Sequence, residues 1–310
     1  MALTIGIDVG GTNIRFGVFE GKKLVEITRL EVNIGGVCRA LTFETAPVEV
    51  IRILFTEIHA LQKKYLAIQA VGVGFPGFID PTTKKIMQSP NLPHLKDFDL
   101  SAQLSKAINL PVALENDANA AAFGEYSLAG KPEGGLIYMG LGTGVGGGLI
   151  LDSKIVSGQH GCAMEVGHII VESNGRQCGC GNKGCMEAYA SATGVAISYF
   201  NAIQKQLTAH QIAELAHKGD KAAIEAYELA ANALAQALAS ILKVVDAQTV
   251  VIGGGMSGAW LLMKSAFDAR FEADLIPVLR DKITVKISTT NDTAGMLGAA
   301  MLSSAKLTLA

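Results

Sequence analysis

Three cysteines and one histidine lie close together in the segment that spans residues 165–187, which has a glutamate at each end. Their spacing is His168-x9-Cys178-x-Cys180-x4-Cys185. Three thiolates and one imidazole form the ligand set of a closed, tetrahedral zinc site. The glycines between the cysteines let the backbone turn tightly enough for several ligands to face one ion. The spacing therefore predicts a structural zinc ion bound by all four residues.

A disulfide and unrelated free thiols are the two other interpretations of these cysteines. Cys178 and Cys180 are too close in the sequence to pair comfortably with each other, and nothing indicates an oxidising compartment. A closed zinc site has no open position for a reactive water, so we expect the metal to hold structure rather than to catalyse. The other two cysteines, Cys38 and Cys162, are expected to be small core residues.

The composition bounds the class of protein. A chain of 310 residues is long for one core and sufficient for two lobes. The net charge of −2 and the pI near 6.3 argue against a protein that holds nucleic acid or an anionic membrane. The first residues do not form a signal peptide, and the apolar stretch Leu229–Val245 carries polar residues typical of a buried helix. We therefore expect a cytoplasmic protein without nucleic-acid or membrane partners.

Glycine-rich turns follow predicted strands at three places. They are Gly10-Gly11-Thr12 between strands 3–9 and 14–19, Gly142-Thr143-Gly144 between strands 136–139 and 149–151, and Gly253-Gly254-Gly255 after strand 249–252. A backbone without Cβ atoms exposes N–H groups that can approach phosphate, although ordinary hairpin turns also favour glycine. Three such turns together indicate a nucleotide, and the two strand–turn–strand units indicate an internal duplication. A strand rather than a helix follows the first two of these turns, so they do not match the glycine-rich fingerprint of dinucleotide-binding (Rossmann) domains.

Polar residues gather where a predicted strand, 112–114, is followed by a predicted helix, 119–126. They are Glu115, Asn116, Asp117 and Asn119. A helix needs only one N-terminal cap, so the surplus favours a functional site over plain capping. At the end of the first strand, Asp8 could bind Mg²⁺ through water. By local sequence alone, Asn91 between two prolines is a turn residue.

The remaining pattern is that of sheets covered by helices, which is the α/β class. Helices are expected at 47–65, 100–109, 194–206, 208–218, 221–245, 258–275 and 291–307. Further strands are expected at 24–32, 67–74 and 283–288. Residues 33–45 are expected to form an irregular, mobile loop, because they contain two adjacent glycines.

Together these motifs resemble those of the ROK family of sugar kinases, over essentially the whole chain. The motifs are Asp8-Val-Gly10-Gly11-Thr12 with Arg15, Glu115-Asn116-Asp117-Ala-Asn119, the glycine run 142–148, Glu165-Val-Gly167-His168 with the cysteines and Glu187, and Gly253-Gly254-Gly255. The resemblance implies a two-lobed actin/hexokinase-like (ribonuclease H-like) ATPase fold with duplicated mixed sheets. It implies one lobe of residues 1–115 plus 292–310 and another of 116–291, with ATP between them and the sugar deep in the cleft.

The resemblance also implies roles for individual residues. Asp117 is the general base, and the residues that line the sugar are Asn91, Asn116, Asp117, Glu165, His168 and Glu187. Those near ATP and its Mg²⁺ are Asp8, Gly10, Gly11, Thr12, Arg15, Gly142, Thr143, Gly144, Gly253, Gly254 and Gly255. A carboxylate that takes the proton of a sugar hydroxyl typically contributes about 10²–10⁴-fold to the rate. His168 would bind zinc through one ring nitrogen and donate to the sugar through the other. Homodimers are common in the family, so one is expected here.

The segments 114–125 and 89–93 look most like those of the glucokinase branch. N-acetylglucosamine and N-acetylmannosamine kinases share nearly all the other motifs and remain the alternative. Two departures are Met164, where the family usually has a small residue, and Asp152-Ser153 in place of an Asn-Gly turn. Met164 either changes the space available to a substituent at one position of the sugar ring or only packs against neighbouring protein atoms. The phosphoryl donor, ATP or polyphosphate, stays open.

Three other function classes compete with a kinase. Sugar-responsive repressors of the same family carry a helix-turn-helix domain ahead of the first motif, and a first strand at Leu3 leaves no room for one. A sugar sensor without catalysis would not need Asp117 together with three glycine-rich turns. The zinc segment argues against an ATPase module that switches a partner. We therefore expect an ATP-dependent kinase that phosphorylates an aldohexose, glucose above all, at its 6-hydroxyl.

Overall fold

The computed structural model describes residues 2–290 and 293–307, the last three of them as backbone only. The chain forms two compact units, Met1–Lys131 with Gly148–Ala163 and Thr293–Ala310, and Pro132–Gly147 with Met164–Asp292. The lobes predicted from the sequence, 1–115 with 292–310 and 116–291, stay a prediction, because compact packing does not show which segments move together.

The first unit is built on a mixed five-stranded sheet in the order β3-β2-β1-β4-β8. The strands are β1 (Leu3–Val9), β2 (Asn13–Glu20), β3 (Lys23–Glu31), β4 (Ile68–Phe75) and β8 (Val112–Asn116). The first three strands form an antiparallel meander, whereas β4 and β8 run parallel to β1. The carboxyl ends of β1 and β8 therefore lie at one edge of the sheet, where the sequence places Asp8 and Asp117.

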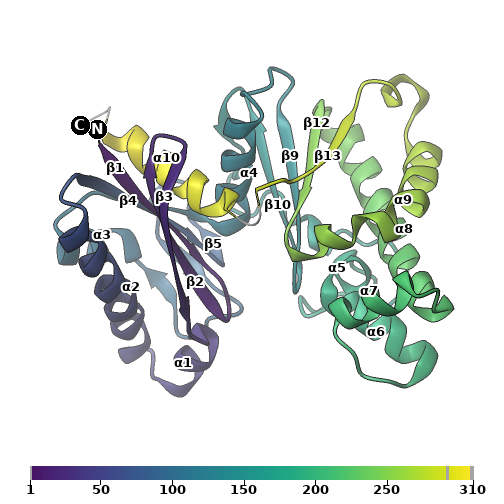
Figure 1. Ribbon diagram of the computed structural model, residues 1–310, viewed down its shortest axis with the longest axis horizontal. Coiled ribbons are helices and arrows are strands. Elements are labelled where there is room, and N and C mark those ends of the chain that lie inside the picture. Colours follow the sequence, from purple (N-terminus) through teal and green to yellow (C-terminus); the bar gives the residue numbers. More distant parts are fainter. Residues whose placement is uncertain (1, 291–292, 308–310) are drawn as a thin grey trace. The chain divides into compact units, whose positions relative to one another are not determined.

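Helices cover both faces of this sheet (Figure 1). On one face, α2 (Thr45–Lys64) and α3 (Leu100–Ile108) bury an apolar core with alternate residues of the strands, such as Ile5 and Ile7 of β1. On the other face, α10 (Ala294–Leu307) packs on β1, β4 and α4 (Asp117–Leu128). The backbones of α10 and α4 approach so closely that a Cβ at Gly298 would lie 1.8 Å from the Ala120 carbonyl oxygen. The predicted close packing of this glycine is confirmed.

The second five-stranded sheet repeats the strand order of the first, as β11-β10-β9-β12-β13. Its strands are β9 (Leu136–Leu141), β10 (Val145–Leu151), β11 (Lys154–Ile155), β12 (Thr249–Gly253) and β13 (Thr284–Ile287). Again an antiparallel hairpin, β10–β11, sits at one end, and β12 runs parallel to β9 and β13. The internal duplication predicted from the two glycine-rich hairpins is confirmed.

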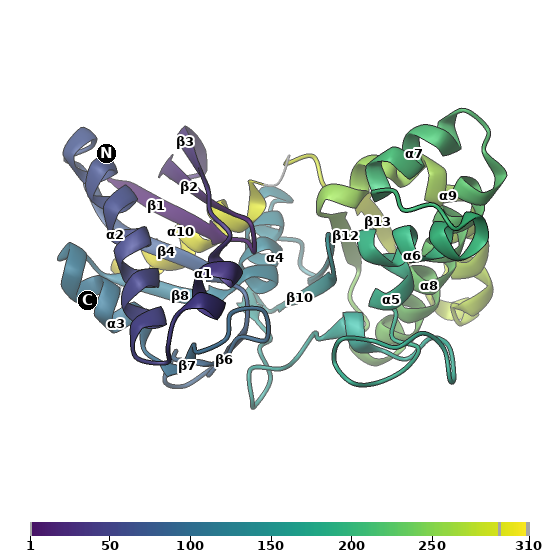
Figure 2. The same cartoon turned by 90° about the horizontal axis from the view of Figure 1, so that it is seen from below.

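A long helix, α8 (Lys221–Val245), lies among the helices of the second unit (Figure 2). The helices packed on it are α5 (Glu187–Ala190), α6 (Ala192–Ile203), α7 (Ala209–His217) and α9 (Trp260–Asp274). Among the described residues, α8 is the one helix long and apolar enough to cross a membrane. More than half of its most apolar window is buried inside the protein, as expected of a core helix. The side chain of Asp220 caps it by accepting from the Ala223 N–H, as the sequence predicts.

The expected loop at residues 33–45 is wrong, because α1 (Ile34–Ala40) lies there and α2 begins at Thr45. The Asn33 side chain caps α1 by accepting from the Gly36 N–H at 2.8 Å. Ile34 and Cys38, four residues apart, are both fully buried on one face of this helix. The adjacent glycines lower the helix propensity, so tertiary burial rather than local preference stabilises α1.

Several short elements were not predicted. A small antiparallel sheet, in the order β5-β6-β7, consists of β5 (Phe78–Ile79), β6 (Ile86–Gln88) and β7 (Lys96–Phe98). The short helix α5 follows the zinc segment. These elements are too short to show a period in the sequence. Cys162 also differs from expectation, since it is exposed, whereas Cys38 is a core residue as predicted.

Candidate active site

The four predicted metal ligands are brought together in the second unit. One ligand atom from each of His168, Cys178, Cys180 and Cys185 lies within 4.8 Å of the others. The Cys180 and Cys185 sulfurs are 3.6 Å apart. Two sulfurs that are each about 2.3 Å from a tetrahedral zinc ion lie roughly 3.8 Å apart. The cluster therefore fits a zinc ion in both donor set and spacing.

The two ring nitrogens of His168 face different groups. Nδ1 is 3.6 Å from the Cys178 sulfur, and Nε2 is 3.9 Å from a carboxylate oxygen of Glu165. His168 ends a short 3₁₀ helix, Val166–His168, so Glu165 and His168 project from one turn. With Nδ1 toward the thiols, Nε2 and the half-exposed Glu165 carboxylate are left on the side away from the metal.

The thiols differ in their surroundings. Burial raises the pKa of Cys178, and it raises the pKa of Cys185 to about 12. The Asn182 N–H lowers the pKa of the exposed Cys180. Without a metal the two buried sulfurs are therefore protonated at neutral pH, and a bound dication would displace their protons.

Arg176 anchors the cysteine segment to the helices behind it. Its guanidinium stacks on the Tyr189 ring at 4.5 Å and donates to the carbonyls of Ala188 and Gly194. The Tyr189 hydroxyl in turn accepts from the Arg176 N–H at 2.9 Å. Arg176 is thus fixed without a metal, whereas the three cysteines follow it in the turns of residues 178–185.

Glu187 links the cysteine segment to the second glycine turn. Its Oε2 accepts from the Val145 N–H at 2.9 Å, directly after Gly142-Thr143-Gly144. A Cβ at Gly144 would lie 2.3 Å from this oxygen, so a larger residue there would require the Glu187 carboxylate to move. The family resemblance implies a role for Glu187 at the sugar alone, and the contact with Val145 was not predicted, because the two residues are 42 positions apart.

Asp117 stands at the first position of α4, directly after β8. Asn116 is the helix cap, with its Oδ1 accepting from the Asn119 N–H at 3.0 Å and its Nδ2 donating to the Gly77 carbonyl at 3.2 Å. Glu115 and Asn119 bond to each other at 3.2 Å within the fold. Of the four polar residues in this motif, three thus hold the turn. The helix begins at Asp117 rather than at the predicted 119.

Burial of its carboxyl raises the pKa of Asp117 above its ordinary value. The Ala118 N–H, which donates to Oδ1 at 2.8 Å, favours the charged form and opposes this shift. A carboxylate that water solvates poorly and that remains partly accessible is a stronger proton acceptor than an ordinary aspartate. This is the property that a general base needs.

Asp8 and the first glycine turn lie at the end of β1. Asp8 pairs across the sheet with Arg15 of β2, and its Oδ2 is 3.9 Å from the Arg15 Nε. In the turn between them Gly11 and Thr12 are exposed, and a Cβ at Gly11 would meet nothing within 4 Å. The backbone of this turn is therefore open to a ligand.

Asn91 lies in an exposed turn between β6 and β7 of the small sheet in the first unit. The Leu92 N–H donates to the Ser89 carbonyl at 3.1 Å, and Ser89 in turn donates to the Pro76 carbonyl at 2.5 Å. The backbone oxygen of Asn91 would be 3.0 Å from a Cβ at Gly35, so α1 borders this turn. The helix missed from the sequence thus helps to position a residue assigned to the sugar.

The third glycine turn and Met164 complete the predicted positions in the second unit. Gly253 ends β12, and Gly254 and Gly255 follow it with a left-handed φ of 81° at Gly254. Met164 also has a left-handed φ, 66°, which is uncommon for a long side chain. Its backbone conformation is thus a second feature, besides its size, that departs from a small residue at this place.

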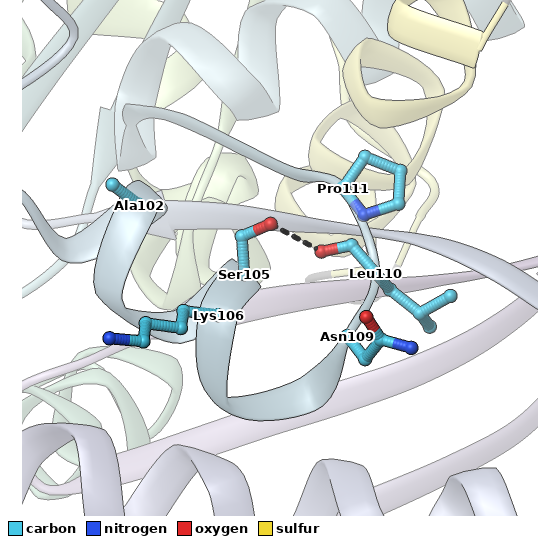
Figure 3. A pocket seen from close by; sticks show the side chains of 6 residues that line it. All are labelled: Ala102, Ser105, Lys106, Asn109, Leu110 and Pro111. Carbon is cyan, nitrogen blue, oxygen red and sulfur yellow. Dashed lines mark hydrogen bonds between the residues drawn. The ribbon is translucent and has the colours of Figure 1, made fainter.

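Each unit holds part of the predicted site. In the first unit are Asp8, Gly10, Gly11, Thr12, Arg15, Asn91, Asn116 and Asp117. In the second are Gly142, Thr143, Gly144, Glu165, His168, the three cysteines, Glu187 and Gly253–Gly255. An open hollow of about 640 Å³ at the end of α3 holds none of them (Figure 3). There the Ser105 hydroxyl donates to the Leu110 carbonyl at 2.7 Å, which closes the turn after the helix.

The chain is similar over nearly its whole length to known proteins. A family model described as the ROK family matches residues 4–306. A glucokinase of Thermotoga maritima is 31% identical over 315 residues, covering 96% of both chains. An N-acetyl-D-glucosamine kinase of Salmonella paratyphi B is 32% identical and covers 96% of this chain and 98% of that protein.

A solved structure has a similar fold. It is a ROK family glucokinase from Streptomyces griseus in complex with glucose and AMPPNP, with a TM-score of 0.82 at 29% identity. The match covers 98% of this chain and 100% of that one. The actin/hexokinase-like fold class predicted from the sequence is confirmed.

Proposed function

Since the chain belongs to the ROK family and is a sugar kinase, we propose that it transfers the γ-phosphoryl group of ATP to the 6-hydroxyl of an aldohexose, glucose above all. The observation that carries the proposal is the turn at Asp117. It presents a carboxylate of raised pKa at a helix N-terminus, held by a cap and by buried hydrogen bonds.

In the proposed reaction Asp117 accepts the proton of the sugar hydroxyl as that oxygen bonds to the γ-phosphorus. The bond from the γ-phosphorus to the bridging oxygen breaks, and ADP leaves with the electron pair. Little covalent chemistry falls to the protein, so positioning of the hydroxyl and neutralisation of phosphate charge provide most of the rate. Asp117 adds about 10²–10⁴-fold as general base.

The remaining predicted residues bind the two substrates. Asn and Glu side chains suit vicinal hydroxyls, because each offers several hydrogen-bonding positions. We assign Asn91, Asn116, Glu165, His168 and Glu187 to the sugar. The glycine turns at 10–12, 142–144 and 253–255, with Arg15, are assigned to ATP, and Asp8 to its Mg²⁺.

Zinc, in this proposal, has a structural role at the sugar. The three sulfurs and Nδ1 would hold the ion, and its presence would keep Nδ1 deprotonated, so that Nε2 carries the proton. His168 Nε2 then donates to a sugar hydroxyl, and the neighbouring Glu165 carboxylate accepts from another. The metal takes no part in the phosphoryl transfer.

The acceptor is tested by a coupled assay for ADP with glucose, mannose, N-acetylglucosamine, N-acetylmannosamine, fructose and allose. The highest kcat/KM is expected for glucose. A higher value for an N-acetylhexosamine would replace the proposal with its alternative, for which the 32% identity to an N-acetyl-D-glucosamine kinase is the support. Assays with polyphosphate in place of ATP test the donor, and ATP is expected to support the faster reaction.

We expect a cytoplasmic homodimer that binds small molecules and neither nucleic acid nor membranes. Sedimentation at several protein concentrations checks the dimer. The lobes 1–115 with 292–310 and 116–291 are expected to close on the sugar, and scattering that glucose leaves unchanged would argue against a large closure.

A further inference from the structure

Glu115 is a buried carboxylate two residues before Asp117, with only 9% of its side chain exposed. Its Oε1 accepts from the Asn116 N–H at 3.1 Å and from Asn119 Nδ2 at 3.2 Å. Its Oε2 is 3.1 Å from the ammonium of Lys84, which comes from a different part of the chain. Each carboxylate oxygen is thus satisfied, and the negative charge has one cationic partner among these contacts.

Lys84 lies in the turn between β5 and β6, and its conformation there is unusual. Its φ is 56°, in the left-handed region that costs a residue with a side chain about 1–2 kcal/mol. The turn is held without the Lys84 side chain, because Asp80 accepts from the Thr82 and Thr83 N–H groups and the Lys84 N–H donates to the Asp80 carbonyl. Glycine would fit this position with less strain, so the turn itself does not require a lysine.

A second contact joins the same small sheet to the same strand end. Asn116 Nδ2 donates to the carbonyl of Gly77, the residue before β5. Beyond β6 the chain leads into the turn of Asn91, which Ser89 ties back to Pro76. The small sheet therefore connects Asn91, assigned to the sugar, with the strand end that carries Asp117.

We propose that Lys84 is a positioning residue for phosphoryl transfer. Its ammonium compensates the buried Glu115 carboxylate and holds the β5–β6 turn against the end of β8, so that Asp117 meets the sugar hydroxyl held by Asn91. The inference rests on the proposed function, since it needs Asp117 to act on the sugar. Lys84 touches no substrate in this role and acts through Glu115.

Charge compensation decides what removal of Lys84 does. A buried ion pair that loses one partner leaves an uncompensated charge, which is far more disruptive than removal of both charges together. The backbone limits the Cα atoms of Glu115 and Asp117 to at most about 7.6 Å apart, so a rearrangement of Glu115 displaces Asp117 as well. A displacement of about 1 Å at a reacting group can cost roughly 10²-fold in rate.

The test compares four variants with the wild-type protein in steady-state kinetics. Lys84→Met should lower kcat about 10- to 100-fold and leave the KM for ATP within about twofold. Lys84→Arg keeps the cation and should stay within about threefold of the wild-type kcat. The double variant Lys84→Met with Glu115→Gln should recover most of the lost kcat, because it removes both charges. Lys85→Met, at the exposed neighbouring position, is the matched control and should change nothing.

Folding and catalysis are separated by a fifth variant. Lys84→Gly removes the ammonium but relieves the left-handed backbone, so it should fold at least as well as Lys84→Met and lose a similar factor in kcat. A kcat within twofold of wild type for Lys84→Met, or no recovery in the double variant, would overturn the proposal. If Asp117→Asn retains full activity, the proposed function fails; if Asp117→Asn is inactive but Lys84→Met and Lys84→Gly retain full activity, the inference alone fails.

Discussion

The Asp117 turn and the cysteine segment both position side chains assigned to the sugar, but they do so by different physical means. In the first unit, Glu115, Asn116 and Asn119 hold the turn through hydrogen bonds of 3.0–3.2 Å that belong to the protein alone. In the second unit, three thiols and an imidazole converge within 4.8 Å, and hydrogen bonds between buried thiols are weak. The Asp117 turn is therefore held by hydrogen bonds within the protein, whereas the four side chains of the second unit fit a bound metal ion.

This difference predicts how each region responds to perturbation. A turn at the junction of a strand and a helix is supported by the sheet and by the packing of α4 on α10. The cysteine segment, apart from the Arg176 anchor, consists of turns with two isolated bridges, Ile170 to Cys185 and Gln177 to Lys183. In the proposed sugar site, loss of zinc should therefore loosen His168 and Glu165 and leave Asp117 in place.

Removal of the base should give the largest effect. Asp117→Asn keeps the size of the side chain and its acceptor for the Ala118 N–H, but it cannot take a proton. We expect kcat to fall about 10²–10⁴-fold while glucose still binds. Steady-state kinetics and calorimetric titration with glucose measure the two properties. A near-wild-type kcat would show that Asp117 is not the base.

Removal of one metal ligand should give the next largest effect, and on binding rather than on turnover. Cys180→Ser should release zinc and raise the KM for glucose about 10- to 100-fold, since a hydrogen bond to a charged or polarised group contributes about 1.5–3 kcal/mol. The exposed Cys162→Ser variant is the matched control and should keep both zinc and affinity. Elemental analysis of the purified protein measures the metal. Full glucose affinity in a zinc-free preparation would refute the proposed role of the metal.

The same comparison explains what could be predicted from the sequence. The four predicted ligands lie within 18 residues of one another (168 to 185), so their spacing alone indicated the cluster that the structure brings together. Long strands and helices were predicted because their hydrophobic period is visible locally, and α8 was predicted with its bounds of 221–245. The duplication followed from two similar glycine-rich hairpins.

Contacts between distant segments could not be predicted in this way. Lys84 and Glu115 are 31 residues apart, and Val145 and Glu187 are 42 apart. Nothing in either local sequence indicates the partner. The helix α1 was missed for a related reason, since its two glycines argue against a helix and only burial of Ile34 and Cys38 in the core explains it. The role of Asp117 as base came from the family resemblance and stays a prediction.

Glu187 offers a way to sharpen the comparison, because it connects the metal-dependent region to a nucleotide turn. Glu187→Ala leaves the Val145 N–H without its carboxylate acceptor, which costs about 1–2 kcal/mol. We expect the KM values for ATP and glucose both to rise, each roughly 5- to 30-fold. Glu187→Gln keeps an acceptor oxygen and should leave the KM for ATP near wild type. If both variants weaken ATP equally, the charge rather than the hydrogen bond holds the turn.

The smallest effect concerns stability, and it separates the two regions by their pH dependence. Burial raises the folded-state pKa of Asp117, so the folded protein binds this proton more tightly than the unfolded chain does. The resulting stabilisation is complete below the ordinary pKa of about 3.9 and is lost as pH rises through the raised value. At pH 7 the ionised carboxylate therefore costs stability, which the neutral Asn of Asp117→Asn removes.

Asp117→Asn should accordingly raise the melting temperature at pH 7, and the gain should shrink on acidification. Exposed Asp281→Asn is the control and should show no such trend. The helix dipole opposes the gain, because a negative charge in the first turn of α4 is favourable by about 0.3–1 kcal/mol. A lower melting temperature for Asp117→Asn would mean that the dipole and the Ala118 N–H outweigh burial. The Asp117 carboxylate would then stabilise the N-terminus of α4 rather than destabilise the fold through burial.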